Sequence, residues 1–171
     1  MSSWPRVMSE LPSGAVTFLF TDVEGSTRLL KQLRDRYGEV LTEHGRLLRD
    51  VFARHDGRVV DTQGDSFFVA FASAREAVLA AVEAQRTLAE HDWPEGTDVR
   101  VRMGIHTGQA VATEEPCHGL AVHRAARIAA AGHGGQVLVS QTTHNLLEDE
   151  EEEFADVKLR DLGEHRLKDL E

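Results

Sequence analysis

A chain of 171 residues, 41% of them hydrophobic, is long enough for one domain with a substantial core. Its 29 acidic and 19 basic side chains give a formal net charge of −10, so the field of the whole protein disfavours nucleic acid. No segment approaches the ~20 apolar residues of a membrane helix and the start lacks the apolar core of a signal peptide, so we expect a cytoplasmic protein that does not span a membrane.

The first expected element is a strand that ends at a carboxylate. Residues 1–13 are rich in proline and serine, which predicts a flexible leader before a single domain at 14–171. The run 16–20 is mostly β-branched or aromatic and leads into Asp22, which predicts a buried strand. The next four residues, Glu24, Gly25, Ser26 and Thr27, predict a tight turn that opens a helix. Backbone N–H groups at such a turn suit a phosphate, and the carboxylate suits the hard cation that accompanies phosphate.

A second carboxylate has a similar setting. Asp65 follows Gly64 between two apolar runs, which predicts a hairpin with the carboxylate at its tip. Asp and Gly are ordinary turn residues, so either segment alone fits a purely structural interpretation equally well. The two carboxylates together indicate a site for metal and phosphate.

The remaining elements follow from apolar periodicity and turn signals. We predict helices over 26–36, 39–54, 73–91, 120–131 and from 140 or 141 to 147. Alternation predicts a strand over 99–105, a turn at Thr107-Gly108, a separate strand over 109–113, a short strand over 136–139 and a closing hairpin over 157–170. The acidic run 148–153 is expected to be a solvated loop. This mixture predicts an α+β fold in which helices pack on a mostly antiparallel sheet.

The number and spacing of the cysteine and histidine residues disfavour a zinc site and an internal disulfide. The nine histidines and the single cysteine show neither His-x-x-x-His nor Cys-x-x-Cys spacing. One cysteine cannot form an internal disulfide, which fits a reducing compartment.

Four motifs in order resemble the catalytic domain of class III nucleotidyl cyclases, most closely its bacterial adenylate cyclase-like branch. They are FLFTDVEGST at 18–27, GD at 64–65, RAAR at 124–127 and LKDL at 167–170, and the resemblance covers 14–170. It implies a ferredoxin-like core with extra elements. It also implies that ATP, or alternatively GTP, is cyclised by attack of the ribose 3′-hydroxyl on the α-phosphate, releasing pyrophosphate.

The resemblance implies roles for individual residues. Asp22, Asp65 and the Val23 carbonyl would hold two Mg²⁺ or Mn²⁺ ions, and the turn 24–27 would face the substrate phosphates. Arg127 matches the family's transition-state arginine, with Arg124 as the structural competitor three residues earlier on nearly the same face. Lys168 matches the lysine that contacts the terminal phosphates.

Three positions depart from the family pattern. Asp61 stands where adenylate cyclases carry lysine and guanylate cyclases glutamate to read the purine. Pro116 occupies the partner base-reading position and has no side-chain donor or acceptor, so Cys117 would take that role only if the loop shifted by one residue. His123 replaces an asparagine; it can donate one hydrogen bond to a ribose or phosphate oxygen, or pack as an ordinary helix histidine.

The resemblance also implies a partner, because the family's site forms between two subunits arranged head to tail. A two-fold homodimer would then carry two sites. The leading hypothesis is an adenylate cyclase that makes cyclic AMP. The alternative is a degenerate cyclase domain that binds nucleotide or a partner protein and regulates without efficient catalysis. A palm-type diguanylate cyclase is a third option, weakened by the absence of a Gly-Gly-Asp/Glu-Glu-Phe string.

Overall fold

A computed structural model describes residues 14–94, 96–110 and 120–148, together with Val157, Arg160 and Leu162. Four predictions therefore lie wholly or mostly outside the described residues. They are the leader, the loop with Pro116 and Cys117, the acidic run 148–153, and the closing hairpin with Lys168.

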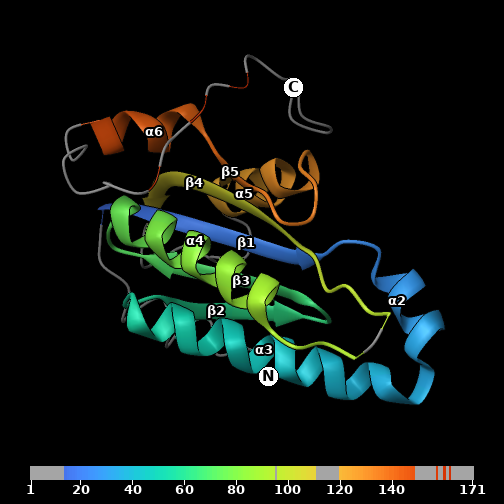
Figure 1. The fold of residues 1–171 in the computed structure, drawn as a ribbon. Coiled ribbons are helices and arrows are strands. Elements are labelled where there is room, and N and C mark those ends of the chain that lie inside the picture. Colours follow the sequence, from blue (N-terminus) through green and yellow to red (C-terminus); the bar gives the residue numbers. More distant parts are fainter. Residues whose placement is uncertain are drawn as a thin grey trace.

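The described residues form a five-stranded sheet with the order β2-β3-β1-β4-β5 (Figure 1). The strands are β1 (Gly14–Val23), β2 (Arg58–Gln63), β3 (Ser66–Phe71), β4 (Val101–Ala110) and β5 (Val137–Val139). The helices are α2 (Ser26–Leu33), α3 (Tyr37–Arg54), α4 (Ala74–Glu90), α5 (Leu120–Ala130) and α6 (Gln141–Leu147), and a 3-10 turn, η1 (Arg34–Arg36), joins α2 to α3. All strand pairs are antiparallel except β4 with β5, so the predicted α+β fold with a mostly antiparallel sheet is confirmed.

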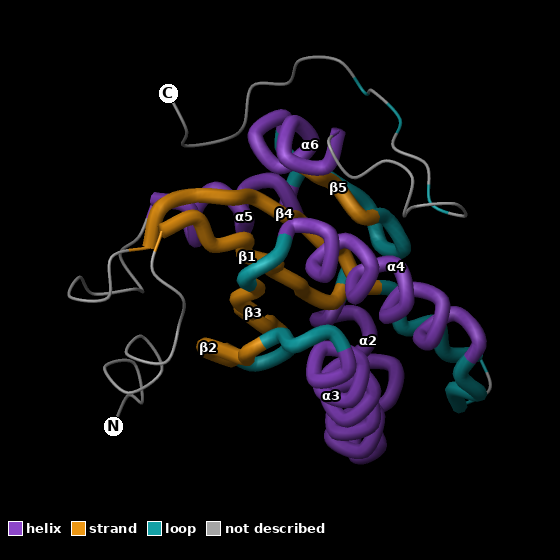
Figure 2. The backbone as a smooth tube through the Cα atoms, turned by 90° about the vertical axis from the view of Figure 1, so that its left-hand side faces the viewer, coloured by secondary structure: helices purple, strands orange, loops and turns teal. Residues whose placement is uncertain are grey.

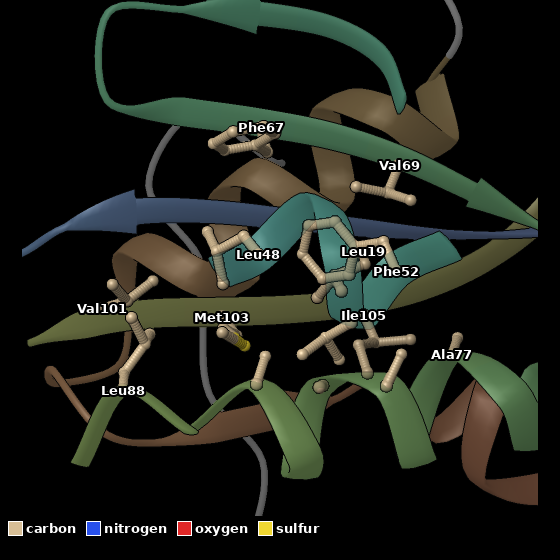
Figure 3. Packing of buried hydrophobic residues seen from close by; sticks show 14 of the residues in the cluster. Leu19, Leu48, Phe52, Phe67, Val69, Ala77, Leu88, Val101, Met103 and Ile105 are labelled. Atoms are coloured by element: carbon tan, nitrogen blue, oxygen red, sulfur yellow. The ribbon is translucent and has the colours of Figure 1, made fainter. Parts of the chain in front are cut away.

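Each face of the sheet has its own core. In Figure 2, α3 and α4 lie on one side of the sheet and α5 on the other. The larger core joins α3 and α4 to side chains such as Leu19, Val69 and Ile105, all fully buried (Figure 3). The smaller core joins α5 to the opposite face through Val16, Phe18 and four further buried residues, Val60, Ala70, Val122 and Ala125. Residues of β1 alternate between the two cores, as the two-residue period of a strand requires.

The predicted turn at Thr107-Gly108 is wrong, because β4 continues through it. Thr107 pairs with Thr17 and Gly108 with Val16 on β1, so Gln109 and Ala110 of the expected second strand are the end of the same strand, and its residues 111–113 lie outside the described residues. The glycine serves packing instead. A Cβ atom on Gly108 would lie 2.5 Å from the Cβ of Ala121, which shows how closely α5 approaches the sheet. A glycine next to a threonine has the composition of a turn, and only the helix packed on it reveals the other role.

A histidine with two carboxylate partners ties α3 to α4. His55 lies just beyond the end of α3, and its Nδ1 is 2.8 Å from Glu76 Oε2 while its Nε2 is 2.5 Å from Glu83 Oε2. Arg54 adds a third contact, 2.7 Å from Nη2 to Glu83 Oε1. Partial burial of the ring lowers the pKa of His55, but hydrogen bonds to the two glutamates outweigh it and raise that pKa above its ordinary value.

We expect His55→Gln to remove a pH-dependent contribution to stability. Because the folded state holds the His55 proton more tightly, the contribution is complete below the unfolded pKa of about 6.5 and is lost as pH rises through the folded pKa. After solvent screening, the loss at pH 5.5 is expected to be about 1 kcal/mol. Urea unfolding at pH 5.5 and 8.5 measures it, with His133→Gln on an exposed loop as the matched control. An equal loss at both pH values would contradict the assignment.

Candidate active site

Asp22 lies near the end of β1 and is paired to an arginine. It stands directly opposite Arg102 in the antiparallel register of β1 and β4. Arg102 donates from Nε to Asp22 Oδ1 at 2.8 Å and from Nη2 to Oδ2 at 2.7 Å. The side chains are 20% exposed for Asp22 and 28% for Arg102. Such a two-point contact fits the planar fork of a guanidinium and fixes the orientation of the carboxylate.

Asp65 lies where it was predicted, at the tip of the β2–β3 hairpin. Gln63 pairs with Ser66, which leaves Gly64 and Asp65 as the turn, and Gly64 has the positive φ of 59° that favours glycine. The Oδ2 atom of Asp65 is buried and has no hydrogen-bond partner among the described residues. A buried carboxylate oxygen without a partner is costly, so a further ligand is expected to satisfy it.

The charges of Asp22 and Asp65 both affect the pKa of Arg102. The hydrogen bonds that Arg102 donates to Asp22 are the largest cause of its raised pKa, and the charge of Asp65 acts in the same direction. Thr21 pairs with Phe67 across β1 and β3, so the two predicted metal carboxylates, far apart in the sequence, lie at the same end of this strand pair.

Two titratable neighbours of Asp65, His44 and Tyr37, supply no positive charge. His44 is 1% exposed, and burial lowers its pKa despite the Leu41 carbonyl and Asp65, which both favour its protonated form. Neither ring nitrogen of His44 has a hydrogen-bond partner among the described residues. Burial and the charge of Asp65 raise the pKa of Tyr37. Both neighbours are therefore neutral near pH 7, and the negative charge of Asp65 remains available to a cation.

The two carboxylates fit a shared hard cation. Among the described residues there is no cluster of three or more His, Cys, Asp or Glu side chains that could hold a metal by itself. Mg²⁺ is commonly bound by one or two carboxylates together with phosphate oxygens and water. Asp22 and Asp65 match that donor set, and Asp65 Oδ2 is the unsatisfied atom that such an ion would satisfy.

The turn after Asp22 holds its shape through backbone contacts. Gly25 precedes α2 with a φ of 66°, and no side chain caps the helix. The Leu29 N–H donates to the Gly25 carbonyl at 3.0 Å, so the N–H groups of Ser26 and Thr27 precede the helical hydrogen-bond ladder. Glu24 is engaged elsewhere: its Oε2 accepts from the Gly134 N–H at 3.0 Å. Whether these four residues contact substrate stays a prediction.

The three other described candidates lie on β2 and α5. Asp61 is half-buried on β2, and its Oδ1 accepts from the Thr62 N–H at 2.9 Å. His123 is exposed and Arg127 half-buried. They lie four residues apart on one face of α5, opposite the face where Ala121 and Ala125 meet the sheet. The structure therefore turns His123 and Arg127 away from the sheet that carries Asp22.

Sequence reasoning missed the role of Arg102. Its alternation with Val101 and Met103 indicated only an exposed strand face. The contact with Asp22 depends on the register of two strands 80 residues apart, which no local pattern reveals. The signal that the sequence offered was an arginine inside an alternating strand, between Val101 and Met103.

Comparisons with known proteins agree on one family. The model of the adenylate and guanylate cyclase catalytic domain matches residues 8–168. An uncharacterized protein of Mycobacterium tuberculosis is 34% identical over 161 residues, which cover 93% of this chain and 53% of that protein. An adenylate cyclase of Mycosarcoma maydis is 34% identical over 155 residues, covering 76% of this chain and 6% of that protein. The chain thus spans about half of the mycobacterial relative and a small part of the fungal one.

Solved structures share the fold. An adenylate cyclase of Trypanosoma brucei in its monomeric state has a TM-score of 0.82 and 28% identity, and the match covers 95% of this chain and 87% of that chain. The adenylyl cyclase CyaB of P. aeruginosa has a TM-score of 0.66 at 21% identity, covering 81% of this chain and 82% of that one, which shows the fold alone.

Proposed function

Because the chain belongs to the adenylate and guanylate cyclase catalytic domain family, we propose that it converts ATP to 3′,5′-cyclic AMP and pyrophosphate. The observation that carries this proposal is the buried Oδ2 of Asp65, which has no hydrogen-bond partner among the described residues and lies at the end of the β1–β3 pair that also carries Asp22. A fold that only needed a hairpin turn would gain nothing from burying that oxygen unsatisfied. The adenylate cyclases among the relatives support ATP as the substrate.

Asp22, Asp65 and the Val23 carbonyl would hold two Mg²⁺ or Mn²⁺ ions. When bound, such ions lower the pKa of the attacking ribose hydroxyl and neutralise charge on the triphosphate. Catalysis of phosphoryl transfer depends mainly on positioning the reactants and neutralising charge, so few other protein groups are needed. The N–H groups of Ser26 and Thr27, in the first turn of α2, are suited to phosphate oxygens.

A second subunit would complete the site. Arg127 and His123 point away from the sheet of their own subunit, where they can reach a head-to-tail partner. A guanidinium from that partner would hold the α-phosphate oxygens as charge develops on them. Lys168 would contact the terminal phosphates. This arrangement gives a homodimer with two sites.

Base selection is the weakest part of the site. The carboxylate of Asp61 accepts hydrogen bonds, which suits the adenine amino group and equally the N1 and N2 protons of guanine. It also adds negative charge where a polyanion binds. These features support modest activity with little discrimination between ATP and GTP, and they favour the regulatory alternative if turnover is absent.

Pyrophosphate and cyclic nucleotide release from purified protein tests the proposal. ATP and GTP are assayed separately, with Mn²⁺ and with Mg²⁺, over a range of protein concentrations. We expect turnover of ATP that is stronger with Mn²⁺ and rises faster than linearly with protein, because two subunits form each site. If metal-dependent nucleotide binding occurs without pyrophosphate release, the domain is regulatory. If nucleotide does not bind at all, cyclase activity and regulation through nucleotide binding are both excluded, and regulation through a partner protein is the function left.

A further inference from the structure

The Asp22–Arg102 pair occupies the carboxylate that a metal ion needs. Both oxygens of Asp22 accept from Arg102, at 2.8 and 2.7 Å. We propose that Arg102 is an internal cation that competes with divalent metal for Asp22 and yields it when a polyphosphate draws the guanidinium away. That the polyphosphate is a nucleoside triphosphate rests on the proposed function. The competition between Arg102 and metal for Asp22 does not rest on it.

The geometry makes this competition direct. Asp22 and Arg102 face each other across neighbouring antiparallel strands, so the backbone already holds them in register. The guanidinium donates one hydrogen bond to each carboxylate oxygen of Asp22, so neither oxygen is fully available to a metal ion. An ion that binds Asp22 must place its own charge near that guanidinium or displace it. At roughly one-quarter exposure for each side chain, the repulsion is only partly screened by water.

The charges around Arg102 show why a divalent metal ion can replace its guanidinium at Asp22. Asp22, Glu24 and Asp65 all act to raise the pKa of Arg102, so the guanidinium is the counter-charge to an acidic cluster. Glu24 is already hydrogen-bonded to the Gly134 N–H. If Arg102 moved away alone, Asp22 and Asp65 would repel each other without compensation. A divalent cation restores the balance, and the released guanidinium then suits phosphate oxygens.

The two carboxylates are not equivalent in this scheme. Asp65 Oδ2 has no hydrogen-bond partner and is ready to accept a ligand, whereas Asp22 is held. Without polyphosphate the site therefore offers metal one free carboxylate instead of two. Metal and polyphosphate should then bind cooperatively, and each should raise the affinity of the other by the same factor.

Binding of Mn²⁺ alone, without any nucleotide, tests the competition. The free Mn²⁺ signal in electron paramagnetic resonance gives the affinity at one fixed pH and salt concentration. We expect Arg102→Met to bind Mn²⁺ roughly tenfold more tightly than the wild type, because an adjacent cation changes the proton affinity of a carboxylate by at least a similar factor. Arg28→Met is the matched control. It removes the same charge from an exposed position on α2, and its affinity should stay close to that of the wild type.

A second variant keeps the test decisive if Arg102→Met is poorly folded. Arg102→Lys keeps the charge but loses the fork, so its Mn²⁺ affinity should lie between those of the wild type and Arg102→Met. Thermal unfolding checks each variant. Unchanged Mn²⁺ affinity in the folded Arg102 variants, or an equal gain in Arg28→Met, overturns the proposal. So does a failure of every variant to bind Mn²⁺.

The readout separates this proposal from the proposed function. A wild type that makes no cyclic nucleotide, while Arg102→Met gains Mn²⁺ affinity, refutes the cyclase activity and supports the competition. A wild type that cyclises ATP, while Arg102→Met shows the wild-type Mn²⁺ affinity, supports the activity and overturns the competition.

Discussion

Asp65→Asn is expected to abolish metal-dependent turnover while leaving the protein at least as stable as the wild type. The substitution removes a negative charge that a divalent ion needs in its ligand. Metal ligation of this kind stabilises the transition state by several kcal/mol, so turnover should fall about 100-fold or more. The stability result follows from the environment of the side chain. The Oδ2 atom of Asp65 is buried without a hydrogen-bond partner, so the folded state gains little from its charge.

Two measurements on the same variant separate function from structure. Cyclic nucleotide release gives the activity, and urea unfolding gives the free energy of unfolding. Asp50→Asn is the control, because it removes the same charge from the exposed face of α3, where Asp50 lies 3.3 Å from Arg46. It should change stability by less than about 0.5 kcal/mol and leave turnover intact. If Asp65→Asn loses stability in step with activity, Asp65 is a structural residue and the metal site is wrong.

Gly104→Ala is expected to cost about 3 kcal/mol of folding free energy, the upper end of overpacking effects. A Cβ atom on Gly104 would come far inside 3.0 Å of two α5 backbone atoms, the Ala125 carbonyl oxygen and the Ala129 nitrogen. Backbone atoms cannot move aside as the end of a flexible side chain can, so α5 must shift away from β4. Arg127 and His123 move with it, and we expect turnover to fall together with stability.

Gly38→Ala is the matched control for this substitution. Gly38 lies in α3 and an added Cβ would meet nothing within 4 Å. Alanine is the better helix former, so this variant should be more stable than the wild type by about 0.5 to 1 kcal/mol. Urea unfolding of both variants tests the pair. Equal stabilities would show that α5 does not sit as tightly on the sheet as the structure indicates.

Local patterns were sufficient for features that one segment specifies alone. A turn between two apolar runs placed Asp65 at a hairpin tip, and Ser73 before an apolar stripe marked the start of α4, where its Oγ accepts from the Glu76 N–H. Periodicity found the helices to within a few residues. It did not show that the predicted helix over 26–36 breaks into α2 and a 3-10 turn, where Arg34 adopts a φ of 51°.

The sequence by itself determined the fold class, the family and the hairpin that carries Asp65, because each depends on residues close together in the chain or on motifs in fixed order. The tertiary structure alone decided that β4 runs on through Gly108, that α5 turns Arg127 away from the sheet, and that Arg102 holds Asp22. These last features arise from strand register and helix packing between distant segments. Strand register and helix packing depend on the free energy of contact between two surfaces, so no single segment of the sequence indicates them.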